Sequence, residues 1–65
     1  MLNLKQQLDV VDRYTIIHVI DKNHKLLGIR DNLKHGFKID NRYDDCKVIR
    51  VSIDVFGYLN IMIEV

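Results

Sequence analysis

Residues 47–65 alternate between apolar and polar side chains twice, and this pattern constrains the fold more than any other feature of the chain. Two apolar sets each fall on one parity: Ile49, Val51 and Ile53 in the first run, and Leu59, Ile61, Ile63 and Val65 in the second. A period of two is typical of a strand with one buried face. The sequence therefore predicts a β-hairpin whose two apolar faces meet the core together.

The length of the loop in this hairpin determines which side chains of the two strands lie opposite one another. A two-residue loop would place Asn60 opposite Ile53 and put a polar group on the apolar face. A three-residue loop, 55–57, places Leu59 opposite Ile53 instead. Asp54 before the loop and Gly57 at its end suit a type I turn closed by a left-handed residue. We therefore predict the pairs Ile53–Leu59, Val51–Ile61 and Ile49–Ile63.

The length and composition of the chain indicate one small domain, residues 1–65. At 65 residues with 48% hydrophobic and 29% charged side chains, the chain is of ordinary globular composition. A domain of this size buries only about 60% of its unfolded surface, so its stability is marginal without further support. The single cysteine excludes an internal disulfide, and no metal-binding set is visible. Self-association is the remaining source of stability.

The net charge and hydropathy of the chain argue against nucleic acid and membranes as partners. Ten lysines and arginines against 9 acidic residues give a formal net charge of +1, which provides no long-range field for nucleic acid or an anionic membrane. No apolar run approaches the roughly 20 residues that span a bilayer, and no secretory signal is recognisable. We expect a cytoplasmic protein that does not bind membranes.

The N-terminal half predicts a helix and a second hairpin. Leu4, Leu8 and Val11 recur at helical spacing in residues 1–12, and Asn3 with Gln6 can form a capping box. Residues 14–21 are β-branched and apolar on both parities, which indicates a central strand covered on both faces. A turn over residues 21–24, similar in layout to 54–57, leads into a strand over 25–30. Two registers stay open there, Val19–Leu27 and Ile20–Leu27.

The remaining segments complete an α+β fold. Residues 31–36 suit a turn that ends at a glycine, a short strand follows around Phe37 and Ile39, and residues 41–45 form a polar connection. We predict a small antiparallel sheet of four to five strands with one N-terminal helix on a face. A small closed β-barrel is the alternative.

The residues that carry chemistry form no catalytic motif. His18, His24 and His35 resemble a small histidine-dependent hydrolase only in residue type, because no spacing brings them together. Cys46 follows two aspartates, and negative charge opposes formation of the thiolate. Asp40, Asp44 and Asp45 lack the offsets of a calcium loop. We therefore expect no catalytic residue, no metal and no cofactor.

A nucleic-acid-binding β module is the alternative function. Arg50, Lys38, Lys47, Arg42 and Tyr43 would form a cationic and aromatic patch if the short strand adjoined the C-terminal hairpin. Acidic residues around it, such as Asp44 and Glu64, dilute this patch, so nucleic acid is not the favoured partner.

The favoured function is a non-enzymatic protein–protein interaction module, such as an accessory protein of bacteria or their phages, that forms a homodimer or larger homo-oligomer and contacts another protein. Apolar residues in the turn of the C-terminal hairpin and on the second parity of the first strand are the expected contact residues: Val55, Phe56, Tyr58, Tyr14, Ile16 and Ile20.

Overall fold

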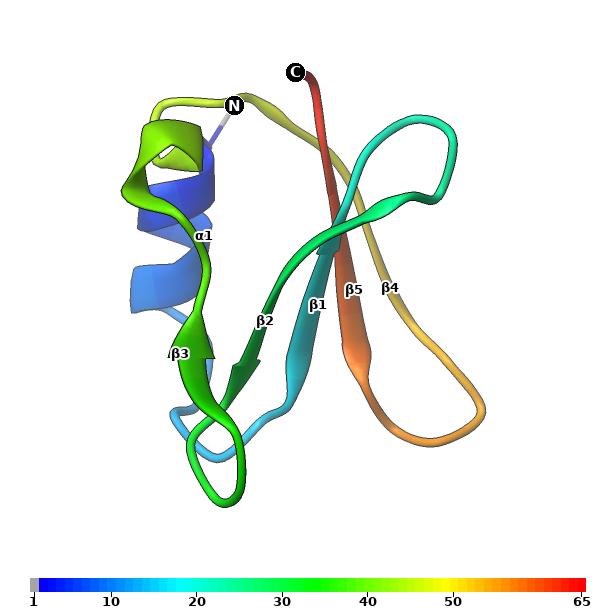
Figure 1. Ribbon diagram of the computed structural model, residues 1–65. Helices are drawn as coiled ribbons and strands as arrows, with labels where there is room; N and C mark the ends of the chain where they lie inside the picture. The colour runs from blue at the N-terminus through cyan, green and yellow to red at the C-terminus, as the bar shows by residue number, and fades with distance from the viewer. Residues whose placement is uncertain (1) are drawn as a thin grey trace.

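The computed structural model describes residues 2–65, which form one short helix, a five-stranded sheet and one 3-10 turn (Figure 1). The elements in chain order are α1 Leu4–Asp9, β1 Ile17–Ile20, β2 Leu26–Asp31, β3 Gly36–Lys38, η1 Asn41–Tyr43, β4 Val48–Ile53 and β5 Leu59–Ile63. The predicted α+β fold is confirmed. Met1, the first residue of the predicted helical range, lies outside the described residues.

The sheet has the strand order β3-β2-β1-β5-β4 and stays open, so the barrel alternative finds no support. Three of its four pairings are antiparallel, as predicted. The fourth pairing, β1 with β5, is parallel, and the sheet is therefore mixed. This pairing joins the two halves of the chain and makes β1 and β5 the central strands.

Helix α1 covers one face of this sheet. The predicted capping box is present: the Asn3 side chain accepts the Gln6 N–H at 2.9 Å, and the Gln6 side chain accepts the Asn3 N–H at 3.0 Å. Leu4 and Leu8 enter the core with residues from β1, β5 and the adjoining segments: Ile17, Val19, Ile39, Val48, Ile61 and Ile63. The helix ends earlier than predicted, at Asp9, so its cover reaches only part of the sheet.

The C-terminal hairpin has the predicted turn and nearly the predicted register. Ile53 lies opposite Leu59 and Val51 opposite Ile61, as expected. At the far end Val48, rather than Ile49, lies opposite Ile63, because a bulge between Val48 and Arg50 shifts the register. The predicted pair Ile49–Ile63 is therefore wrong. A bulge inverts the alternation beyond it, but Val48 and Ile49 are both apolar, so the sequence fits either register at this end.

The helix-side face of this hairpin is buried unevenly. Ile61 and Ile63 on β5 are completely buried, whereas Val51 on β4 is 42% exposed and Ile53 is 72% exposed. The apolar set assigned to β4 is therefore largely outside the core. The six-residue helix and the outer position of β4 account for the difference.

The N-terminal hairpin uses both registers that the sequence left open. The pair Val19–Gly28 belongs to the register of Ile20–Leu27, and the pair Ile20–Leu26 belongs to the register of Val19–Leu27. Leu27 forms a bulge between the two registers, so neither of the two named pairs itself forms. The turn repeats the predicted layout of 54–57: Asp21 Oδ1 accepts the N–H groups of Asn23 and Lys25 at 2.8 and 3.0 Å. Its fourth residue, His24, has a positive φ of 63°.

The strand predicted over residues 14–21 begins later than expected, at Ile17. Tyr14 lies in a preceding turn, where its N–H donates to Asp12 Oδ1 at 2.8 Å. The expectation that β1 is covered on both faces is also wrong for the single chain. Ile17 and Val19 are completely buried beneath α1, but His18 and Ile20 on the other parity are only half-buried.

Candidate binding surfaces

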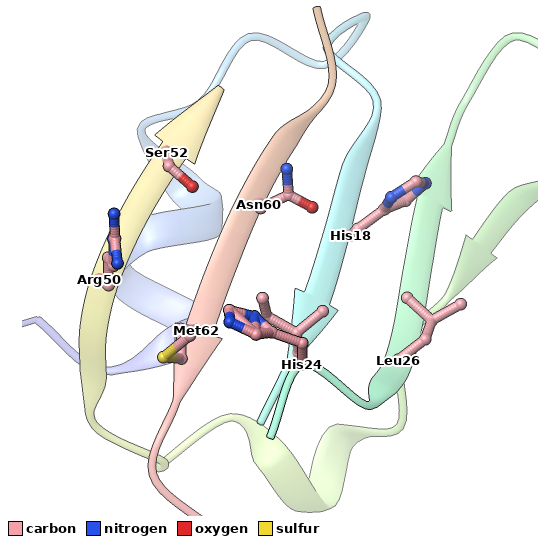
Figure 2. A pocket seen from close by; sticks show the side chains of 8 residues that line it. His18, His24, Leu26, Arg50, Ser52, Asn60 and Met62 are labelled. Atoms are coloured by element: carbon pink, nitrogen blue, oxygen red, sulfur yellow. The ribbon is translucent and has the colours of Figure 1, made fainter. Parts of the chain in front are cut away.

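The face of the sheet opposite α1 carries no covering element within residues 2–65, and we call it the open face (Figure 2). A hollow of about 630 Å³ lies on it, lined by His18, Ile20, His24, Leu26, Arg50, Ser52, Asn60 and Met62. These residues come from four strands and from the turn between β1 and β2. The hollow is therefore a product of the sheet topology rather than of any local sequence motif.

Side chains in the hollow combine hydrogen-bonding groups with an apolar floor. Arg50 and Ser52 project from β4 and Asn60 from β5, while His18 projects from β1 in the same direction (Figure 2). Met62 on β5 and Leu26 on β2 add apolar surface to the hollow. Arginine, amide and imidazole groups around an apolar floor suit a ligand that has both an anionic and an apolar or planar part.

A second hollow of about 350 Å³ adjoins the first on the open face. It is lined by Ile16, His18, Ile29, Asp31, Lys34, His35 and Tyr58, so His18 contributes to both. The His18 and Tyr58 rings meet edge to face, with centroids 5.1 Å apart. His18 lies on β1 and lines both hollows, whereas Tyr58 lies just before β5 and lines only the second.

Asp54 is the carboxylate most tightly bound into this side of the sheet. Its Oδ1 accepts the N–H groups of Phe56 and Tyr58 at 2.9 and 3.1 Å, and Asn60 donates to its Oδ2 at 3.3 Å. Desolvation raises the pKa of Asp54, but these hydrogen bonds and the nearby His18 outweigh it and hold the pKa below its ordinary value. The ionised Asp54 carboxylate therefore stabilises the hairpin turn through these hydrogen bonds.

The second candidate surface is the exposed edge of β4, which we call the β4 edge and define as residues 50–54. At the opposite edge of the sheet, β3 has only three residues and carries Lys38, both features that discourage pairing with another chain. Strand β4 has six residues, no proline, and exposed Val51 and Ile53. It is the less protected of the two edges.

Val55 and Phe56 form the tip of the β4–β5 hairpin and are 94% and 77% exposed. The Phe56 ring centroid lies 5.9 Å from that of Tyr58, and neither Val55 nor Phe56 belongs to the hydrophobic core. The six expected contact residues therefore occupy three places: Val55 and Phe56 at the tip, Ile16, Ile20 and Tyr58 on the open face, and Tyr14 in the turn before β1.

Catalytic and metal-binding arrangements are not apparent among the described residues. His18 and His24 line one hollow and His18 and His35 the other, but neither pair shares a hydrogen bond with a carboxylate or a nucleophile. Within residues 2–65, no group of three or more histidine, cysteine, aspartate or glutamate side chains is placed to hold a metal ion. Cys46 is a free, half-buried thiol beside the core.

Arg30 is the polar residue that sequence reasoning missed. It is 6% exposed on the helix side of β2, and its Nη2 donates to the backbone oxygens of Asp12 and Thr15 at 2.6 and 3.2 Å. Burial lowers the pKa of Arg30, and the charge of Asp12 partly offsets this effect. Arg30 thereby ties the loop between α1 and β1 to the sheet. An arginine in an alternating strand is the only sequence signal, and it is too common to be diagnostic.

The predicted cationic patch is not assembled. It required the short strand to adjoin the C-terminal hairpin, but Lys38 on β3 and Arg50 on β4 lie on opposite edges of the sheet. Arg42 instead stacks on Tyr43 within η1, with its guanidinium carbon 4.8 Å from the ring centre.

Fold and surfaces together define a small α+β protein with one uncovered sheet face and an open sheet whose β4 edge is the less protected. Comparison with protein-family models, curated proteins and solved structures finds no match to this chain. In the part of the chain that the structure describes, no helix has the length and apolar character needed to cross a bilayer.

Proposed function

We propose that this protein is a non-enzymatic protein–protein interaction module that assembles with a second copy of itself through the β4 edge. The observation that carries the proposal is the coincidence of exposed apolar side chains and unpaired backbone groups on the same residues, Val51 and Ile53. A cytoplasmic setting fits the one cysteine of the chain being a free thiol.

The direction of the backbone groups follows from the hairpin turn. The Asp54 N–H donates to the Tyr58 oxygen at 3.0 Å, and the Asp54 oxygen accepts the Gly57 N–H at 3.1 Å, so both groups point toward β5. Alternate residues of an antiparallel strand direct these groups to opposite sides. Ile53 and Val51 therefore direct theirs outward, away from the sheet, where a second strand can pair with them.

The sequence of the β4 edge favours one register for a two-fold pair. Regular pairing with β5 runs from Arg50 to Ile53 and the turn closes at Asp54, so the centre of this segment is Ser52. An antiparallel pair centred on Ser52 places Val51 opposite Ile53 of the second copy and Arg50 opposite its Asp54. Apolar side chains then meet on the helix side and opposite charges meet on the open face, which are both favourable cross-strand pairs.

Matched charge insertions test the edge. Ile53→Lys places a cation in the proposed interface, and Val10→Lys is the control because Val10 is also 72% exposed but lies just after α1. Sedimentation equilibrium should show a wild-type dimer whose dissociation constant rises at least tenfold, about 1.4 kcal/mol, in Ile53→Lys and stays within about twofold in Val10→Lys. A wild-type monomer at high micromolar concentration, or equal effects of both changes, contradicts the proposal.

Cysteine cross-linking tests the register. Ser52 faces its own copy at a non-hydrogen-bonded position, where the Cα atoms are about 4.5 Å apart, within the range that a disulfide spans. In a Cys46→Ser background, Ser52→Cys should form a disulfide-linked dimer on mild oxidation, whereas Arg50→Cys should not. Equal cross-linking by both variants would indicate random collision rather than this register.

A further inference from the structure

The open face has the layout of a platform for stacking planar groups. The His18 ring on β1 and the Tyr58 ring just before β5 meet edge to face with centroids 5.1 Å apart, and His18 lines the hollows on both sides of it. Nucleic-acid bases stack on aromatic side chains of sheet surfaces, and each stacked base contributes about 1–3 kcal/mol. If a base stacks on this pair, the nucleotides before and after that base would lie in the two hollows.

Cationic groups line both hollows and are not neutralised within the described chain. Arg50 lies in the first hollow and Lys34 in the second, and neither takes part in the ion pairs among residues 2–65, which are Lys22–Glu64 and Arg42–Asp40. The carboxylate in the second hollow, Asp31, is 6% exposed and accepts the N–H groups of Leu33 and Lys34 at 3.1 Å. The Asp31 carboxylate is therefore hydrogen-bonded to the backbone of the loop that follows β2.

His24 supplies an independent observation. Its φ of 63° is a left-handed conformation, which histidine adopts more often than most residues with a Cβ. The equivalent position of the other hairpin turn holds Gly57, with a φ of 81°. In that conformation the His24 imidazole turns back over the first hollow toward Met62 (Figure 2).

We propose that the open face binds single-stranded nucleic acid, with a base stacked on the His18–Tyr58 pair, one phosphate near Arg50 and His24, and another near Lys34 and His35. Two adjoining hollows that share His18, with Tyr58 lining the second, suit a chain of alternating bases and phosphates better than a single small anion. The formal net charge of +1 adds no long-range attraction. Binding therefore depends on these local contacts, and this proposal does not depend on self-association.

Fluorescence anisotropy with labelled oligothymidine and oligouridine of about ten nucleotides tests the proposal, a length within the range that small sheet domains occupy. Neutralising two phosphates on a single strand predicts a slope of log K against log salt of about −1.4, and Lys34→Gln should reduce it to about −0.7 while weakening binding about threefold. Lys5→Gln removes the same charge from α1 on the opposite face and should change affinity by less than about twofold.

His24→Gly separates binding from folding. Glycine suits the left-handed turn, so the variant should unfold at the same or a higher temperature, yet bind the oligonucleotide at least about fivefold more weakly. Tyr58→Leu, which keeps apolar bulk but removes the ring, should also weaken binding. Absence of oligonucleotide binding at low salt, equal losses in Lys34→Gln and Lys5→Gln, or complete competition by thymidine monophosphate at the same concentration of phosphate groups would each overturn the proposal.

Discussion

Replacing Ile61 by alanine tests which side chains of the C-terminal hairpin form the core. Ile61 is completely buried on β5, next to Val19 of β1 and opposite Val51 of β4. The change removes three carbons, or about 2.4 kcal/mol of transfer free energy at about 0.8 kcal/mol each. The remaining cavity brings the expected loss to about 3 kcal/mol, within the range of about 2–5 for such changes.

This loss is a large share of the roughly 3–10 kcal/mol of total stability that a 65-residue domain has. Ile53→Ala is the matched control: it makes the same change on the same face of the same hairpin, but at a residue 72% exposed. Its expected cost in the monomer is below about 0.7 kcal/mol. If Ile61→Ala does not fold, Ile61→Val provides a graded change of about 0.5–1.5 kcal/mol.

Urea unfolding followed by circular dichroism, at a protein concentration low enough to keep the chain monomeric, measures these free energies. A loss in Ile61→Ala no larger than that in Ile53→Ala would refute the assignment of the core. A cost of Ile53→Ala that grows with protein concentration would instead be the expected sign of β4 pairing, because association stabilises only the folded chain.

Two further predictions concern the hairpin turn. Hydrogen bonds hold the pKa of Asp54 in the folded protein below its unfolded value. The stability that ionised Asp54 contributes is therefore fully present above the unfolded pKa and is lost as pH falls through the folded pKa. In urea titrations taken from pH 5 toward pH 2.5, wild type should lose more unfolding free energy than Asp54→Ala. The double change Val55→Asn with Phe56→Asp at the exposed tip should leave the unfolding free energy within about 0.5 kcal/mol in urea titrations, because both side chains are already in water; a clear loss of stability would instead assign the tip to the core.

The sequence predicted the local features of this fold well, namely its helix cap, its C-terminal turn and two cross-strand pairs. The Asn3–Gln6 capping box, the turn from Asp54 to Gly57 and the pairs Ile53–Leu59 and Val51–Ile61 were all predictable because each depends on residues close together in the chain. The similarity between the two hairpin turns also holds at the level of hydrogen bonds, since Asp21 and Asp54 each accept the N–H groups two and four residues ahead.

What the sequence could not predict depends on the order of the strands. Alternation gives the same weight to Ile53 and Ile61, but β5 lies in the centre of the sheet and β4 at its edge, so one residue is exposed and the other buried. The parallel pairing of β1 with β5 also brings His18 beside Asn60, 42 positions further along the chain, and no local pattern signals that neighbour. The open-face hollow was unpredictable for the same reason.

The two proposed surfaces meet along β4, where the edge contact involves both sides of the sheet and the nucleic-acid site only the open face. A two-fold pair centred on Ser52 has its axis perpendicular to the sheet, so both open faces would lie on one side and both helices on the other. Arg50 belongs to both surfaces, because it lines the hollow and would also face Asp54 of the second copy. Its substitution cannot separate the two functions. Ile53 and His24 separate them better, because the Ile53 side chain lies on the helix side of the edge and the His24 imidazole over the open face: His24→Gly leaves the β4 edge unchanged, and Ile53→Lys replaces no side chain of the hollow.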